Sequence, residues 1–177
     1  DAKDTFSFLM LKITLPCAIV TNLNGQRIEP EFFTIIIIGV IYNFISLIVG
    51  WISGLKDRRS IMLMINVSGY NIGGFAMPFI NGIMEGSSIV VASMFDIGNS
   101  IMCLGINYSI AMGIKDSLTK FSLMKIVVNI AKSIPVLAYI FMITLRVFNC
   151  NLSEYIIPYF DVIGKANTFV AMFMIGL

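Results

Sequence analysis

The chain has 177 residues, of which 58% are hydrophobic and 12% charged, and its formal net charge is +2. A soluble domain has about 25% charged residues and still leaves roughly 30% of its unfolded surface in water, so this composition argues against a soluble globular domain. With no run of like charges and no basic face, nothing in the sequence predicts binding to nucleic acid.

Residues that carry catalytic or metal-binding chemistry are sparse. Cys17, Cys103 and Cys150 lie far apart, and histidine is absent. The sequence therefore predicts neither a disulfide framework nor a metal site, and it lacks the commonest general base. We therefore expect that the chain is not an enzyme and binds no cofactor.

Six apolar stretches are long enough to cross a bilayer. Because backbone polar groups in lipid must be satisfied within the segment, each stretch is predicted to be a helix. They cover roughly residues 6–23, 32–55, 61–81, 87–113, 126–147 and 153–177. The sequence predicts one all-α, multi-pass membrane domain over residues 1–177. The last stretch ends within an apolar run and no signal peptide opens the chain, so we expect a fragment of a longer protein.

Basic residues predict the orientation of these helices. They cluster after the second stretch and after the fourth, as Lys56, Arg58, Arg59, Lys115, Lys120 and Lys125. By the positive-inside rule these two connections are cytoplasmic, so the first helix runs outward. Residues 117–131 are predicted to lie partly along the membrane surface. Pro16 in the first stretch and Pro135 in the fifth are interpreted as kinks.

The third stretch is the most polar of the six. It contains Asn66, Asn71, Gly73, Gly74 and Pro78 within one crossing. Such a segment is predicted to break, and a break at bilayer depth survives only where it is buried or lines a cavity. In transporters, broken helices aim their ends at a substrate or ion, so these five residues are candidate substrate-binding residues. The alternative is a small-residue packing face with a simple kink.

Asp96 lies inside the fourth stretch, far from the basic connections. A carboxylate there costs several kcal/mol unless it is paired, protonated or facing water. Asp96 is therefore a candidate proton or sodium site, with Asn99 and Ser100 as candidate partners. The alternative is a carboxylate hydrogen-bonded for structural reasons. In the sixth stretch, Asp161 and Lys165 are four residues apart and are expected to form an ion pair.

Three short runs resemble the auxin efflux carrier family, which includes bacterial malate and malonate permease-like proteins. Residues 15–20 (LPCAIV) resemble the LPAL-type element of that family's second span. Residues 71–78 are similar to its N-x-G-x-x-G-x-P stretch, with Ala76 where glycine is usual. Residues 171–177 (AMFMIGL) are similar to the AMF-x-L-G-L run of its seventh span.

This resemblance implies a ten-helix carrier of two inverted five-helix repeats with broken crossing helices, similar to bile-acid sodium symporters. The chain would supply spans two to seven. Asn71 and the break at Pro78 would then meet a carboxylate substrate. The implied function is secondary transport of a small organic anion, such as a dicarboxylate, across the cytoplasmic membrane by alternating access, with H⁺ or Na⁺ as coupling ion.

Two other function classes also place a chain in a membrane, and a homodimer is also compatible with the sequence. A channel-like pore, or a carrier of another solute, would use the same polar span. A membrane-embedded enzyme is disfavoured because no catalytic arrangement is recognisable. The bilayer and a small organic anion are the expected partners.

Overall fold

A computed structural model describes residues 2–55, 60–84, 87–107 and 123–176. Every regular element in these ranges is a helix, which confirms the predicted all-α class. Three elements are π-helical turns (η), in which an N–H bonds to the carbonyl five residues earlier. The elements are α1 (Ala2–Leu9), η1 (Met10–Thr14), α2 (Leu15–Leu23), α3 (Phe32–Gly54), α4 (Ser60–Val67), η2 (Ile72–Ala76), α5 (Met77–Ile83), α6 (Ser87–Ile101), η3 (Met102–Asn107), α8 (Leu123–Lys132), α9 (Ile134–Val147) and α10 (Ile157–Gly176).

The chain forms two compact units. Unit 1 comprises Asp1–Phe32, Asn71–Ser93 and Ile134–Leu177, and unit 2 comprises Phe33–Tyr70 and Met94–Ser133. Helix α6 contributes its first half to unit 1 and its second half to unit 2. Each unit is therefore assembled from segments that are distant in the sequence.

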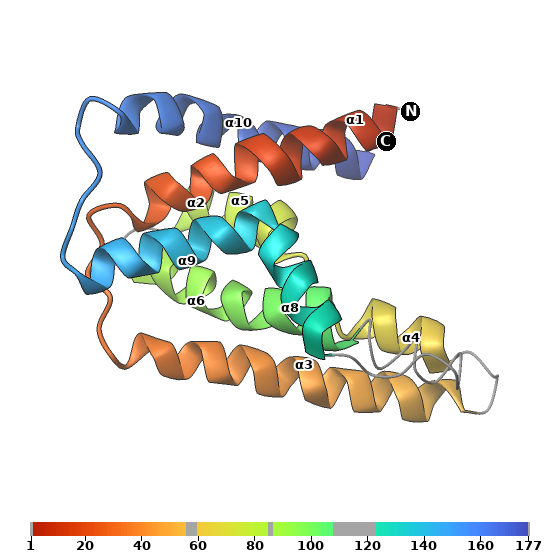
Figure 1. Cartoon of the computed structure of the whole chain (residues 1–177). Coiled ribbons are helices and arrows are strands. Elements are labelled where there is room, and N and C mark those ends of the chain that lie inside the picture. Colours follow the sequence, from red (N-terminus) through yellow and green to blue (C-terminus); the bar gives the residue numbers. More distant parts are fainter. Residues whose placement is uncertain (1, 56–59, 85–86, 108–122, 177) are drawn as a thin grey trace. The chain divides into compact units, whose positions relative to one another are not determined.

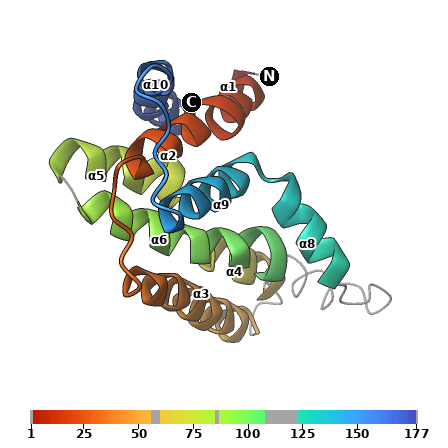
Figure 2. The same ribbon diagram turned by 60° about the vertical axis from the view of Figure 1, so that its left-hand side comes forward.

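In unit 1, α10 packs against α1, η1, α2, η2 and α5, while α2 also packs against α9 (Figures 1 and 2). Close approach of α10 to α2 depends on Gly164. A Cβ on this residue would lie 2.9 Å from the Cα of Ala18. A stripe of Met10, Val170 and Ala171 forms the apolar contact near the other end of α10. Glycine is thus what lets the two backbones touch.

Proline stands near the start of two helices and inside two helical runs. Pro135 and Pro158 are each the second residue of a helix that follows a non-helical residue. Proline is favoured there because the first-turn N–H has no helical partner and the ring pre-sets φ. Pro135 is therefore not the mid-helix kink that was predicted. Pro16 and Pro78 instead follow π-helical turns within continuous helical runs, so the kink at Pro16 stays a prediction. The fifth predicted stretch is accordingly divided into α8 and α9 at Ser133.

In unit 2, three glycines set the spacing of α3 against its neighbours. A Cβ on Gly39 would lie 2.7 Å from the carbonyl oxygen of Phe95, and one on Gly98 would lie 2.3 Å from that of Ile36. A Cβ on Gly50 would lie 2.8 Å from the carbonyl oxygen of Leu63. Helix α3 is therefore in backbone contact with α6 near one end and with α4 near the other.

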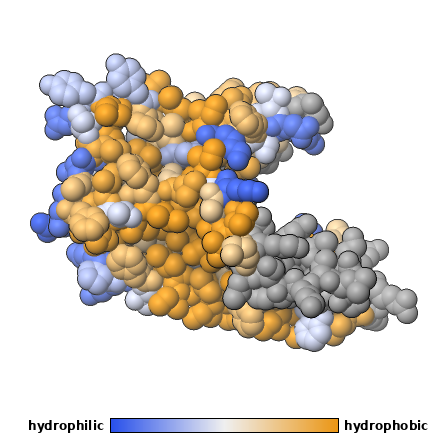
Figure 3. All heavy atoms as spheres, in the orientation of Figure 1, coloured by the Kyte–Doolittle hydropathy of each residue, from blue (hydrophilic) through white to orange (hydrophobic). Residues whose placement is uncertain are grey.

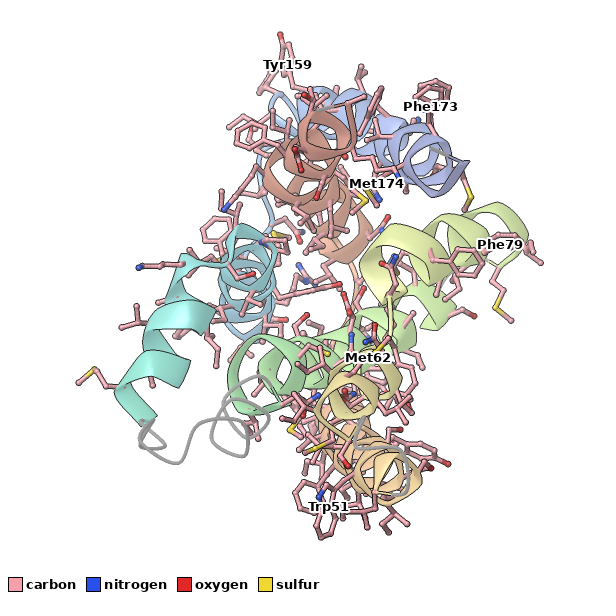
Figure 4. All side chains as sticks on the ribbon, turned by 90° about the vertical axis from the view of Figure 1, so that its right-hand side faces the viewer. Trp51, Met62, Phe79, Tyr159, Phe173 and Met174 are labelled. Atoms are coloured by element: carbon pink, nitrogen blue, oxygen red, sulfur yellow. The ribbon has the colours of Figure 1, made fainter. Side chains whose placement is uncertain are left out.

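Helix α3 buries small and polar residues and exposes large apolar ones. Its buried residues are Gly39, Asn43, Leu47, Gly50 and Gly54. Its exposed side chains include eleven large hydrophobic ones, and the surface along α3 is mainly hydrophobic in Figure 3. Trp51 points away from the helices in Figure 4. A helix that packs into a soluble core shows the opposite pattern.

Two helices are long and apolar enough to cross a membrane. They are the continuous Ala2–Leu23 helix and α3, and only 17% of the apolar window of α3 is buried. These bounds agree with the first two predicted stretches. The third predicted stretch is interrupted at residues 68–71, and the fourth is helical to Asn107. Lys56, Arg58, Arg59, Lys115 and Lys120 lie outside the described residues.

Two connections in unit 1 are held together by polar contacts. Helix α9 ends in a Schellman motif: Asn149, at φ 53°, is followed by Cys150, whose N–H bonds to the carbonyl of Leu145 at 2.8 Å. The Arg146 guanidinium donates to the carbonyl of Gln26 at 2.6 Å. It also donates to the Cys150 carbonyl at 3.3 Å. The loop after α2 is thereby tied to the end of α9.

Candidate functional site

The candidate site in unit 2 surrounds residues 68–70, which are non-helical and which we name the unwound segment. Helix α4 ends at Val67, and the chain does not resume a helix until Ile72. The Asn99 side chain of α6 bonds to both backbone groups of Tyr70. Its Oδ1 accepts from the Tyr70 N–H at 3.1 Å, and its Nδ2 donates to the Tyr70 carbonyl at 2.7 Å. One amide therefore replaces the helical partners that the unwound backbone lost.

Asp96 lies one helical turn before Asn99. The Asn99 Nδ2 also donates to Asp96 Oδ1 at 3.1 Å, and the two residues are only 5% and 4% exposed. Burial takes this carboxylate out of water, and a bare charge is costly in such a place unless polar groups face it. The structure thus brings together Asp96 and Asn99 of the three predicted ion-coupling residues. Ser100 lies next in the sequence and is half-buried.

Asn43 and Cys103 complete what we call the polar cluster, together with Asp96, Asn99 and the Tyr70 backbone. Asn43 is fully buried and donates to Asn99 Oδ1 at 3.3 Å and to the Gly39 carbonyl at 3.1 Å. The Cys103 thiol lies 3.3 Å from Asn99 Oδ1 and 3.6 Å from Asn43 Oδ1. Asn99 Oδ1 is therefore shared by three donors. Such a fully connected buried network is expected to hold its geometry rigidly.

A second buried asparagine contacts the start of the unwound segment. The Asn107 Nδ2 donates to Ser68 Oγ at 2.8 Å and to the Ser68 carbonyl at 3.4 Å. Ser68 Oγ in turn donates to the carbonyl of Met64. Both residues are buried, and Asn107 Oδ1 has no hydrogen-bond partner among the residues that the structure describes, which end here at Asn107 and resume at Leu123. This end of the site therefore keeps one acceptor that the described residues leave unused.

The predicted substrate-binding residues divide between the two units. Asn66 belongs to α4 in unit 2, where it is exposed and donates to the carbonyl of Met62 in its own helix at 2.8 Å. Asn71, Gly73, Gly74 and Pro78 belong to unit 1. The break was predicted within Asn71–Pro78. Asn71 is non-helical, whereas Gly73, Gly74 and Pro78 lie in η2 and α5, so the chain unwinds at and just before the start of the predicted stretch.

The reason for this shift is the π-helical turn η2. The Asn71 carbonyl accepts from the N–H of Phe75 at 3.1 Å and from that of Ala76 at 3.3 Å. A π-helical turn of this kind lets a helix accommodate a following proline without breaking there. Asn71 is exposed beside the unwound segment.

The predicted ion pair of Asp161 and Lys165 is present in α10. Their side chains are 2.6 Å apart, and the Lys165 side chain is 76% exposed. An exposed pair of this kind satisfies both charges locally and contributes little stability. Its position gives no reason to assign it to a binding site.

Asn167 of α10 was missed by the sequence analysis. It is 3% exposed, accepts from Thr14 Oγ1 at 2.9 Å, and donates to the Gly73 carbonyl at 3.3 Å. The signal that could have found it is the one used for Asp96, a polar residue within a long apolar stretch. The same signal marks Asn43.

The chemistry of the polar cluster is that of oxygen ligands and amide donors. Among the described residues, no group of three Cys, Asp or Glu side chains could hold a metal ion. Carboxylate, amide and carbonyl oxygens suit a hard monovalent cation or a proton. No protein-family model, curated protein or solved structure matches this chain.

Proposed function

We propose that this chain belongs to a secondary transporter of the auxin efflux carrier type, which moves a small organic anion across the cytoplasmic membrane. The observation that carries the proposal is the unwound segment. Among apolar helices, a non-helical stretch held by a buried amide and flanked by a buried carboxylate is what carriers use to bind solutes. The resemblance in residues 15–20, 71–78 and 171–177 supports the family.

The lipid environment is proposed for all six predicted crossings. Two helices meet the length and hydropathy of a membrane span. The side chains of α3 support this environment, because its large apolar residues are exposed and its small residues are buried. Lipid can contact the large residues, while the small ones let neighbouring helices pack closely. Exposed aromatic residues on other helices, such as Phe79 and Tyr159 in Figure 4, fit the same environment.

Substrate binding is assigned to the segment from Asn71 to Pro78. The helical run of η2 and α5 begins at Ile72, and its first turn presents N–H groups and the positive end of a helix, which attract a carboxylate. The Asn71 amide would add a neutral donor. A dicarboxylate such as malate or malonate is the class that the family resemblance favours.

Ion coupling is assigned to Asp96, with Asn99 as its partner and Ser100 as an adjacent hydroxyl. A proton or Na⁺ bound there would neutralise a carboxylate that is otherwise costly to bury. The chain contains no GxxxxGK[ST] motif, so a gradient would supply the energy. The two compact units are what alternating access requires, since one part of a carrier must move against another.

Uptake by the full-length protein in proteoliposomes tests this function. Radiolabelled malate and malonate are the probes, with imposed Na⁺ or H⁺ gradients. We expect saturable uptake that one gradient accelerates, and Asp96→Asn should remove the acceleration. Asp161→Asn is the matched control, because that carboxylate is exposed and already paired, and it should keep the gradient dependence.

Two results would count against the proposal. Large single-channel currents would show a channel-like pore instead of a carrier. Gradient dependence that persists in Asp96→Asn would remove the assignment of the coupling site.

A further inference from the structure

In the π-helical register of η2, Pro78 denies the carbonyl of Gly73 a backbone donor. In η2 the hydrogen bonds run five residues back, as the bond from the Ala76 N–H to the Asn71 carbonyl at 3.3 Å shows. In that register the donor to the Gly73 carbonyl would be residue 78. Proline has no N–H, so this carbonyl must find another donor or remain unsatisfied.

Asn167 supplies that donor from α10. Its Nδ2 lies 3.3 Å from the Gly73 carbonyl, and Gly73 is buried. Its Oδ1 accepts from Thr14 Oγ1 at 2.9 Å. A reversed amide would place two acceptors against each other at Gly73. Because the Gly73 carbonyl can only accept, it fixes the amide with its NH₂ group toward the break, and the Thr14 hydroxyl supplies the donor for Oδ1.

Asn167 is also held at a fixed height on α10. One turn earlier, Gly164 packs directly on the backbone of α2, where an added Cβ would come within 2.9 Å of Ala18. One turn later, Val170 and Ala171 are buried in the apolar contact with Met10. The amide thus projects from a rigid part of unit 1. Its donor position is set by a backbone contact on one side and an apolar contact on the other.

Asn167 joins two equivalent features of the chain. Thr14 ends η1, and Pro16 follows two residues later; Ala76 ends η2, and Pro78 follows two residues later. Each π-helical turn relieves a proline in the same way. One side chain of α10 bonds to both turns, so it couples their positions.

We propose that Asn167 is a positioning residue for the substrate-binding segment at Asn71–Pro78. This rests on the proposed function, since the segment is assigned there to an organic anion. By holding the Gly73 carbonyl, Asn167 sets the direction of the η2 start and hence where the Asn71 amide and the free N–H groups point. It does not touch the substrate itself.

Asn167→Leu in the full-length protein tests the proposal, because leucine is similar in size but donates no hydrogen bond. Asn22→Leu is the matched control: it is the same substitution in unit 1, on α2, at a half-buried position. The first measurement is the KM and maximal rate of malate and malonate uptake per folded protein in proteoliposomes. The second is hydrogen–deuterium exchange of peptides that cover residues 70–80 and α3.

We expect Asn167→Leu to raise KM by about five- to tenfold, the factor that corresponds to one net hydrogen bond. Exchange in residues 70–80 should accelerate by a similar factor, while exchange in α3 stays the same. Asn22→Leu should change neither quantity. A residue that only stabilised the fold would lower the yield of folded protein and leave KM unchanged.

Three outcomes are decisive. Unchanged exchange at residues 70–80 would overturn the proposal, because the break would not depend on Asn167. Accelerated exchange with an unchanged KM would overturn the role in substrate positioning. If the wild-type protein transports neither probe, the proposed function fails, and the exchange experiment still decides whether Asn167 holds the break.

Discussion

The substitution Gly98→Ala tests whether backbone contact between α3 and α6 holds the polar cluster together. An ideal Cβ on Gly98 lies 2.3 Å from the carbonyl oxygen of Ile36 and 3.0 Å from the backbone N of Val40. Ordinary contact begins at 3.4 Å, so the Ile36 carbonyl must retreat by about 1.1 Å. Both clashing groups are backbone, so no side chain can rotate away and the helices must separate.

The energetic cost follows from this separation. Overpacking of this kind costs about 1–3 kcal/mol. The 3.3 Å bond between Asn43 and Asn99 cannot survive another ångström, which adds about 1 kcal/mol. Alanine returns about 1 kcal/mol through its higher helix propensity. We therefore expect Gly98→Ala to lower the free energy of unfolding by about 1–3 kcal/mol.

Unfolding in mixed SDS–dodecylmaltoside micelles, followed by circular dichroism, measures this difference. Gly82→Ala in α5 is the control, since nothing lies within 4 Å of an added Cβ there. It should leave the stability unchanged or raise it by up to about 1 kcal/mol. If Gly98→Ala proves as stable as Gly82→Ala, close helix contact is not what organises unit 2.

Three further substitutions have defined outcomes in the same unfolding assay. Asn99→Leu leaves the Tyr70 N–H and carbonyl without partners and should lower the free energy of unfolding by about 2–4 kcal/mol. The control Asn66→Leu removes only a bond within its own exposed helix and should lower it by less than about 1 kcal/mol. Equal losses of stability in the two variants would contradict the role given to Asn99. Arg146→Gln should cost about 1–2 kcal/mol because two charge-assisted bonds to loop carbonyls are lost, and faster hydrogen exchange in the loop after α2 should accompany it. Lys165→Gln should cost about 0.5 kcal/mol, as expected for an exposed pair with Asp161; a loss several times larger would show that the pair is desolvated.

Apolar run length predicted the helices best where the run is uninterrupted. The predicted 32–55 agrees with α3 to within one residue. Apolar run length failed where a single polar residue separates two helices, as at Ser133. Mean hydropathy is taken over many residues, so one residue at which a helix ends does not show in it. The same averaging hid the end of α4 at Val67.

Polar residues inside apolar stretches were the better guide to the site. Asp96 and Asn99 were identified this way, and they hydrogen-bond each other. The exact place of the break could not be predicted, because Pro78 shows that a helix must adapt but not where. The residues before Pro78 form the π-helical turn η2, and the non-helical residues precede this turn. The bond from Asn167 to Gly73 links residues 94 positions apart, and no local pattern encodes it.

The side-chain distribution on α3 determines which of its residues can be substituted without loss of packing. At the outward positions, Ile, Val, Leu and Phe would exchange freely, because lipid accepts each of them. At Gly39 and Gly50 a single added methyl would collide with a neighbouring backbone. A saturation mutagenesis survey of α3 should therefore be the mirror image of one on a soluble core helix. The least hydrophobic positions would be the most constrained, and the trace of common ancestry along this helix would lie in its smallest residues.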